Sequence, residues 1–325
     1  MLCTRAERSA RGRRCLAALV VAALAVVLTA CAAPSVPSPA VVRPTRAAVI
    51  RPTPSVAIAQ QPTATAPPPT ATAPPAPPPR PTGTATIAAT PTADPAAIVA
   101  RAHVPVLCYH HIRNWLPSDT PADKPYIVPL KRFRAELDDL VHHGWHTITL
   151  DQLDAYLTAG TPLPPKPIVL TFDDGDANQW TLALPELQQR HLTAAFFIMT
   201  VTLDQPHYLT TAQVRMLDRM GMTIGAHTWD HHPVTRYHGD EWRRQITVPT
   251  QQLATITGHP IRYFAYPDGL WNAAAIPQVQ AAGFAAAFQL ADPLDARAPL
   301  YTLRRVIANS YWSLAQFETA ISTWF

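Results

Sequence analysis

Short apolar runs alternate with longer amphipathic segments from residue 104 to residue 324 of this 325-residue chain. The runs have the length of strands, and each reads as a nearly continuous hydrophobic stretch, as strands do when helices cover both faces of a parallel sheet. We therefore predict an α/β fold, and the periodicity leaves an open doubly wound sheet and a barrel equally possible. The predicted strands span 104–109, 146–150, 167–172, 194–199, 222–226, 263–266, 284–288 and 303–307, and helices are predicted at 131–143, 177–190, 211–220, 240–257, 273–282 and 313–324.

The first 30 residues have the layout of an export signal. Arg residues precede an unbroken apolar run over 16–28, which is short for a membrane-spanning helix of about 20 residues. Next comes Leu28-Thr29-Ala30-Cys31, which resembles the cleavage box of bacterial lipoproteins. We predict a signal peptide at 1–30 and a lipidated Cys31, which would hold the exported protein on the outer side of the cytoplasmic membrane or at the cell surface. The alternative is an ordinary signal with an incidental cysteine.

The segment after Cys31 is dominated by Pro, Thr and Ala as far as about residue 97. It has no helical or strand periodicity, and such a composition buries too little apolar surface to fold. We predict a disordered Pro/Thr/Ala-rich linker over 31–98 and one folded domain over 99–325.

The charge of the chain is divided unevenly. The first 93 residues hold nine Arg and one Glu, so they carry a net charge of +8, and the remaining residues carry −4 of the total of +4. A mildly acidic domain argues against nucleic acid as a partner, because phosphate binding needs a clustered positive surface. After Cys31 the only cysteine is Cys108, so the domain has no internal disulfide.

Polar residues follow several of the predicted strands directly. The sequence Thr171-Phe172-Asp173-Asp174-Gly175 places two carboxylates and a turn-forming Gly at the end of an apolar strand. Adjacent side chains leave a strand in different directions, so one Asp can face a metal while the other faces a water. A single Asp-Asp-Gly is also common in solvated turns.

A pair of histidines strengthens the metal interpretation. His227 and His231 stand four residues apart after another predicted strand, in His227-Thr228-Trp229-Asp230-His231. Two His and one carboxylate with an open fourth position form a catalytic zinc-type site. His232 adjoins the pair, so spacing alone leaves the second ligand undecided between His231 and His232.

A third element is the strand and turn Arg262-Tyr263-Phe264-Ala265-Tyr266-Pro267-Asp268-Gly269. The Arg could cap a surface strand or supply a fixed cation beside a carboxylate. Together, the three elements resemble in residues and order the motifs of the NodB-type polysaccharide deacetylases, carbohydrate esterase family four. The resemblance covers nearly all of the segment from Val104 onward.

The resemblance implies a fold, a metal site and roles for single residues. The expected fold is a distorted (β/α)7–8 barrel, with the active site at the carboxyl ends of the strands. Asp174, His227 and His231 are the implied metal ligands, and zinc is the implied metal, with cobalt, nickel and manganese as alternatives. The remaining implied roles are the catalytic base for Asp173, the residue that orients that base for Arg262, and the backbone oxyanion donor for Tyr266.

The chain departs from the commonest family pattern at its general acid. That pattern has a C-terminal Leu-x-His motif, whereas this chain has Leu303-Arg304-Arg305 and no His after His259. An Arg does not act as a general acid at neutral pH, because its pKa exceeds about 12. A subgroup that resembles the poly-N-acetylglucosamine deacetylases has a Tyr-His motif after its first strand. We therefore expect His110 to be the acid, with His111 as the alternate.

These observations predict a metal-dependent hydrolase that removes N-acetyl groups from an extracellular or cell-wall polysaccharide containing N-acetylglucosamine. Its partners would be that acetylated polysaccharide and, through Cys31, a membrane. Two alternatives keep the same fold: an enzyme that cleaves O-acetyl groups from xylan or opens non-sugar amides, and an inactive glycan-binding module.

Overall fold

The computed structural model describes residues 93–325. The predicted signal peptide, Cys31 and most of the predicted linker lie outside the described residues. Helix α1 (Pro95–Arg101) is capped by the Asp94 side chain and buries Ile98. Helix α1 begins four residues before the predicted domain boundary at 99 and packs an apolar side chain into the core.

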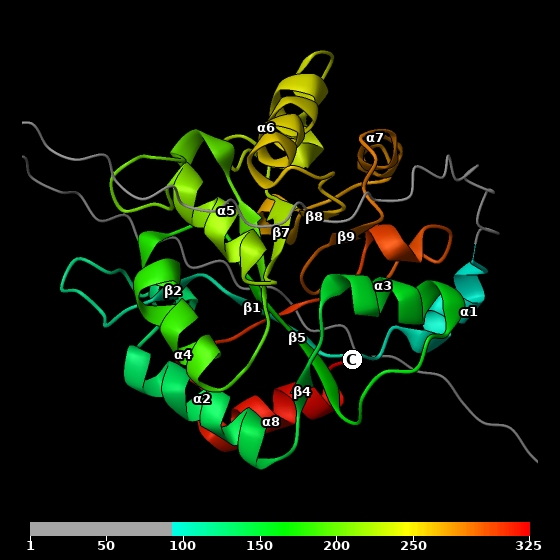
Figure 1. Cartoon of the computed structure of the whole chain (residues 1–325). Helices are drawn as coiled ribbons and strands as arrows, with labels where there is room; N and C mark the ends of the chain where they lie inside the picture. The colour runs from blue at the N-terminus through cyan, green and yellow to red at the C-terminus, as the bar shows by residue number, and fades with distance from the viewer. Residues whose placement is uncertain (1–92) are drawn as a thin grey trace, which may run out of the picture. The chain divides into compact units, whose positions relative to one another are not determined.

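A curled parallel sheet forms the centre of the domain (Figure 1). Its strand order is β10-β1-β5-β6-β7-β8-β9, and β4 pairs with β5 beside this path. A separate parallel pair joins β2 (His111–Ile112) to β3 (Ile127–Val128). The strands of the main sheet are β1 (Val106–Tyr109), β4 (His146–Thr147), β5 (Pro167–Phe172), β6 (Ala195–Ile198), β7 (Thr223–Ala226), β8 (Tyr263–Ala265), β9 (Ala286–Phe288) and β10 (Val306–Ile307).

The segment 303–307 connects the two sides of this sheet. Leu303 forms a parallel bridge with Phe288 of β9, and three residues later, at Val306, β10 begins to pair with β1. The strands therefore enclose an interior, and the predicted distorted barrel is confirmed in preference to an open sheet.

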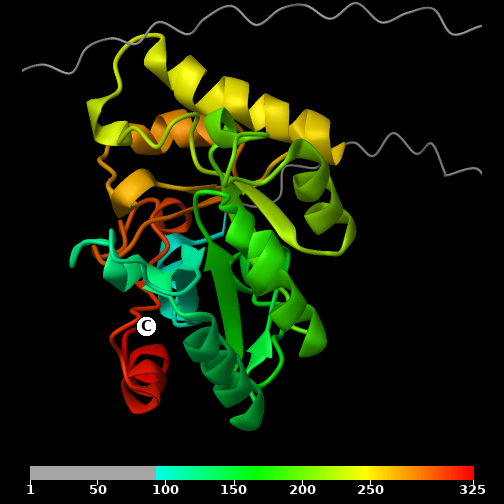
Figure 2. The same ribbon diagram turned by 90° about the vertical axis from the view of Figure 1, so that its left-hand side faces the viewer.

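Helices cover the outside of the curled sheet (Figure 2). Three of them begin with a capping box, in which Thr149, Thr210 or Ser313 exchanges hydrogen bonds with a Gln three residues later. The helices after α1 are α2 (Leu130–His142), α3 (Leu150–Ala159), α4 (Leu184–Gln189), α5 (Thr211–Arg219), α6 (Val248–Thr257), α7 (Ala275–Ala281) and α8 (Leu314–Thr323), and π-helical turns at Gln179–Ala183 and Arg243–Thr247 lead into α4 and α6.

Helix α3 was not among the predicted helices. The strand predicted over 146–150 ends at Thr147, because Thr149 caps α3 and Leu150 begins it. Within residues 93–325, none of the helices combines the length and the hydrophobicity needed to cross a bilayer.

The alternation along the strands separates two hydrophobic cores. On β5, Ile168, Leu170 and Phe172 pack beneath the outer helices, whereas Val169 joins an inner cluster with residues of β1, β6, β8 and β9. Because successive side chains point to opposite faces, Thr171 and Asp173 follow Val169 into the interior. The strand period thus aims Asp173 into the barrel.

Candidate active site

The carboxyl ends of the strands surround a cavity of about 380 Å³. This is the end at which barrels of parallel strands hold their active sites. The residues that line the cavity come from the β1 and β5 ends, from the β2–β3 loop, and from the turns after β7, β8 and β9: His110, His111, Arg113, Asp119, Asp123, Tyr126, Ile127, Asp173, Asp174, His231, Asp268, Gly269, Leu290 and Arg305.

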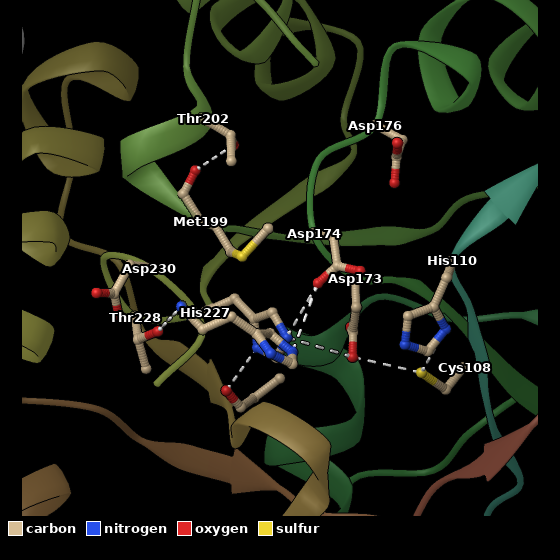
Figure 3. A network of polar contacts seen from close by, with 12 residues as sticks. Cys108, His110, Asp173, Asp174, Asp176, Met199, Thr202, His227, Thr228 and Asp230 are labelled. Atoms are coloured by element: carbon tan, nitrogen blue, oxygen red, sulfur yellow. Dashed lines mark hydrogen bonds and ion pairs between the residues drawn. The ribbon is translucent and has the colours of Figure 1, made fainter. Parts of the chain in front are cut away.

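The structure brings the three expected metal ligands together. Figure 3 labels two of them, Asp174 and His227, with Asp173 beside them. Asp174, His227 and His231 each offer a donor atom, and these atoms all lie within 4.8 Å of one another. Oδ1 of Asp174 is 3.5 Å from Nε2 of His227 and 3.7 Å from Nε2 of His231. Two imidazoles and a carboxylate at these separations can hold one divalent cation between them.

His227 has the protonation state that a metal ligand needs. Its Nδ1 donates a hydrogen bond of 2.8 Å to the Ala265 carbonyl oxygen, which leaves the lone pair on Nε2. Burial holds the pKa of His227 below its ordinary value, so the ring is neutral at pH 7. Nε2 of His227 and Oδ1 of Asp174 are buried without a hydrogen-bond partner among the described residues, as donor atoms reserved for a cation would be.

The backbone around the ligands adopts conformations that side chains other than Gly rarely take. Asp174, Thr228 and His231 have φ angles of 74°, 66° and 66°. Such strain is most costly for a β-branched residue such as Thr228, and strained residues of this kind cluster at functional sites. The Thr228 hydroxyl accepts a hydrogen bond of 3.0 Å from the His231 amide, which turns the chain so that His231 faces Asp174. His232 is exposed and packs near Tyr237, so His231 is the partner of His227.

Asp173 is buried beside the ligand group and is held by Arg305. Nη1 and Nη2 of Arg305 donate hydrogen bonds of 2.7 Å to the two carboxylate oxygens of Asp173. Burial by itself would raise the pKa of Asp173, but the charge of Arg305 outweighs it and keeps that pKa well below its ordinary value. Asp173 is therefore an ionised, fixed acceptor at the floor of the cavity.

The expectation that Arg262 orients Asp173 is wrong. Arg262 stands at the opposite, amino end of β8, where its guanidinium pairs with Asp151 at 2.6 Å and Asp154 at 2.8 Å. The guanidinium that contacts Asp173 belongs to Arg305, immediately before β10. The sequence holds a signal for this contact. Arg304 and Arg305 stand next to each other directly before β10, and because adjacent side chains of a strand point to opposite faces, one of the two must face the interior.

The Tyr266 amide is not free to bind an oxyanion, contrary to expectation. It donates a hydrogen bond of 2.9 Å to the Phe288 carbonyl oxygen, because the pairing between β8 and β9 continues past Ala265. The residues of this turn that line the cavity are Asp268, which has a φ of 56°, and Gly269.

His110 and His111 both line the cavity, but they have different partners. Nδ1 of His111 lies 3.0 Å from a carboxylate oxygen of Asp176. Burial opposes the charged form of that ring, yet the Asp176 carboxylate raises the pKa of His111 above its ordinary value. The ring of His110 instead packs edge-on against Tyr126. His110 is thus free of any ion pair within the described part of the chain, and it faces the same cavity as Asp173.

The side chain of Cys108, on β1, lies between the side chains of Asp173 and His110. Its Sγ is 3.4 Å from Oδ2 of Asp173 and 3.9 Å from Nδ1 of His110. Burial raises the pKa of Cys108 well above its ordinary value, so the group is a thiol that donates to the Asp173 carboxylate. The place of Cys108 on β1, in phase with Val106 of the inner cluster, aims its side chain inward, so strand alternation carried a signal for this contact.

Comparison with known proteins identifies a family that resembles the part of the chain carrying these residues. The model of the polysaccharide deacetylase family matches residues 160–287, which include Asp173, Asp174, His227 and His231. The predicted family resemblance is confirmed by this match. His110 and Arg305 lie outside the matched region.

Two curated relatives match over longer stretches. YxkH of Bacillus subtilis is 24% identical over 183 residues, which are 56% of this chain and 63% of YxkH. The poly-beta-1,6-N-acetyl-D-glucosamine N-deacetylase of Escherichia coli K12 is 26% identical over 250 residues, which are 63% of this chain and 37% of that protein. The chain therefore spans less than two thirds of the length of both relatives.

The fold is also that of a solved deacetylase. The Streptococcus pyogenes deacetylase PplD, determined with acetate, aligns with a TM-score of 0.63 at 20% identity. The alignment covers 67% of this chain and 97% of that structure. The likeness therefore extends over almost the whole of the solved protein and bears on the fold alone.

Proposed function

Since the chain contains a polysaccharide deacetylase domain, we propose that it hydrolyses the N-acetyl groups of a polysaccharide that contains N-acetylglucosamine. The observation that carries the proposal is the convergence of Asp174, His227 and His231 on one point beside the fixed carboxylate of Asp173. The name of the Escherichia coli relative supports a polymer of N-acetylglucosamine as the substrate.

The metal would be held by Asp174, His227 and His231. When bound, a divalent ion would polarise the acetamido carbonyl and lower the pKa of a water in the cavity toward about 7. We propose zinc, because two imidazoles and a carboxylate with an open position suit it, although cobalt, nickel and manganese accept the same donors.

Asp173 would take the proton of the attacking water. Its carboxylate is ionised and cannot rotate away, since Arg305 holds both oxygens. Strong pairing makes a carboxylate a weak base, so the water must already be acidified when Asp173 accepts its proton. Arg305 acts here by fixing the position and charge of Asp173.

His110 would protonate the leaving amine. Its imidazole reaches the cavity from the end of β1, on the side of the Tyr126 ring. Cleavage of an amide needs a group that can give a proton to the leaving amine, and a His is the commonest side chain in this role. Backbone stabilisation of the oxyanion would come from the Asp268 amide, because the amides of Tyr266 and Gly269 already donate to the carbonyl oxygens of Phe288 and Tyr266.

We further propose that the protein acts outside the cytoplasm. The export-like segment 1–30, the lipoprotein-like box at Cys31 and the Pro/Thr/Ala-rich segment after it support a tethered enzyme that reaches a polymer at some distance from a membrane. Metabolic labelling with a fatty acid would test the tether: a Cys31→Ser variant should lose the label.

Acetate release tests the proposed reaction. The purified protein should release acetate from N-acetylglucosamine polymers, lose this activity on chelation, and regain it when zinc is added back. Release from O-acetylated xylan alone would point to an esterase. No release from any acetylated glycan, together with a site that binds no metal, would point to a binding module.

A further inference from the structure

Three exposed aromatic side chains stand beside the cavity on the side of His110. Tyr126 and Trp115 belong to the loop 113–126 between β2 and β3, which Figure 1 shows in teal, and Tyr311 follows β10. Their exposed fractions are 40%, 39% and 53%. We call Trp115, Tyr126 and Tyr311 the aromatic shelf.

The shelf is held in place by polar contacts. The indole nitrogen of Trp115 donates a hydrogen bond of 2.9 Å to the Ile127 carbonyl oxygen, and its ring centroid lies 5.4 Å from that of Tyr311. The Ser310 hydroxyl donates a hydrogen bond of 2.6 Å to the Lys124 carbonyl oxygen, which ties the loop after β10 to the β2–β3 loop. The Trp115 ring is fixed in this way, with Nζ of Lys124 5.2 Å from its centroid, so it loses little conformational entropy when a ligand covers it.

The shelf continues directly from the cavity. Tyr126 and Ile127 line the cavity, and the Tyr126 ring centroid lies 5.1 Å from that of His110. Trp115 bonds to Ile127, so it stands next to the cavity rim, with Tyr311 against it. A ligand that fills the cavity and extends past His110 therefore meets Tyr126 first and the other two rings next.

Polar groups of the same loop border the rings. Arg113 pairs with Asp119 through bonds of 2.8 Å and 2.9 Å, and both side chains line the cavity. Asp123 lines it as well and accepts hydrogen bonds from Thr120. The wall thus combines flat apolar faces with fixed carboxylates and a guanidinium, a pattern typical of sites that orient a ligand by a few polar contacts.

We propose that the aromatic shelf is a sugar-binding subsite that holds the residues of the glycan next to the one being deacetylated. The inference rests on the proposed function and adds to it a requirement for an oligomeric substrate. A pyranose has a face of C–H groups that packs on an aromatic ring, and its hydroxyls radiate from the edge, where Arg113, Asp119 and Asp123 offer partners. The shelf makes the enzyme select a chain of sugars over a single sugar.

The dependence of rate on chain length tests the subsite. N-acetylglucosamine oligomers of two and of five or six sugars would be assayed with wild type, Trp115→Ala and Tyr311→Ala. Each variant should lose roughly five- to tenfold in kcat/KM on the long oligomer, the change expected for one aromatic contact, and little on the dimer. Trp324→Ala is the matched control, because Trp324 is 47% exposed and belongs to neither the shelf nor the cavity lining.

The inference would be overturned if both shelf variants kept the wild-type ratio of kcat/KM on the long oligomer to kcat/KM on the dimer, whether because neither value changed or because both fell equally. If instead the proposed function is wrong, the wild-type protein will release no acetate from any oligomer, and this result separates the two failures. In that case calorimetric titration of the long oligomer decides the subsite. Binding by wild type and Trp324→Ala that weakens in Trp115→Ala supports it, whereas binding that is absent in wild type or equal in all three overturns it.

Discussion

Arg305 and Asp173 lie 132 residues apart in the chain and face each other inside the barrel through two hydrogen bonds of 2.7 Å. Both side chains are almost fully buried, with exposed fractions of 2% and 3%. A buried charge without its partner is costly, so each of these residues depends on the other for its place in the interior.

Replacing Arg305 should therefore affect both stability and turnover. Arg305→Ala should lower the free energy of unfolding by about 3–5 kcal/mol, because it leaves a buried carboxylate unpaired. Arg305→Lys keeps the charge but not the two parallel bonds, and we expect kcat to fall about 10- to 100-fold in a folded protein. Chemical denaturation and acetate release measure the two effects.

Arg262→Gln is the control for that experiment. Its guanidinium is about half exposed and pairs with Asp151 and Asp154 far from the cavity, so kcat should stay close to the wild-type value. A loss of turnover in Arg262→Gln as large as in Arg305→Lys would contradict the assignment of Arg305.

The metal site can be tested by removing single ligands. Asp174→Asn, His227→Ala and His231→Ala should each lower the metal content of the purified protein, measured by mass spectrometry, and abolish acetate release. His232→Ala is a matched control, since this neighbouring ring is exposed and packs near Tyr237. Full metal content in all three ligand variants would show that the cation binds elsewhere.

The two cavity histidines should differ in their effect on catalysis. We expect His110→Ala to lower kcat by about 10²- to 10⁴-fold with the metal retained, because the leaving amine loses its proton donor. His111→Ala should act mainly through Asp176, whose carboxylate would lose its ion pair, and kcat should fall much less. Unchanged turnover in His110→Ala would end its assignment as the acid.

Glu136 should give the stability of the domain a dependence on pH. It is fully buried in α2, where Tyr109 donates to it at 3.0 Å and Arg132 at 2.7 Å. Burial raises the pKa of Glu136 to about 7, despite the opposing charge of Arg132. The folded state then keeps a proton that the unfolded chain releases from about pH 4.5, so the free energy of unfolding falls as pH rises toward 7.

Titration of Glu136 should lower the free energy of unfolding by at most about 3 kcal/mol between about pH 4.5 and pH 7. Urea denaturation at pH 4.5 and pH 7.5 measures it, and Glu136→Gln should show a smaller difference between the two values, because the variant has no proton to lose. Equal differences in wild type and variant would mean that Glu136 does not titrate in this range.

Local patterns predicted the features that depend on neighbouring residues. The bounds of β5 match the prediction, because an apolar run ended by Asp-Asp-Gly specifies both the strand and its end. The convergence of Asp174, His227 and His231 also followed from the sequence, since parallel strands carry their carboxyl ends to one edge.

Features that depend on pairing between distant strands were not predicted. Strand alternation requires one of Arg304 and Arg305 to face inward, but it does not say which interior group that residue meets. The occupied amide of Tyr266 likewise depends on its register with Phe288, which the sequence of either strand leaves undefined. The extra pair of strands β2 and β3 joins two-residue segments that are too short to produce a periodic signal.

The closing segment 303–307 sets an order of events during synthesis. A ribosome delivers Asp173 well over one hundred residues before Arg305, so the nascent carboxylate has no cation to meet and stays hydrated. The interior can become dry around Asp173 only when the last strand docks between β9 and β1. Completion of the cavity is thereby coupled to the docking of β10, and a chain not yet synthesised as far as Arg305 lacks the cation that holds Asp173.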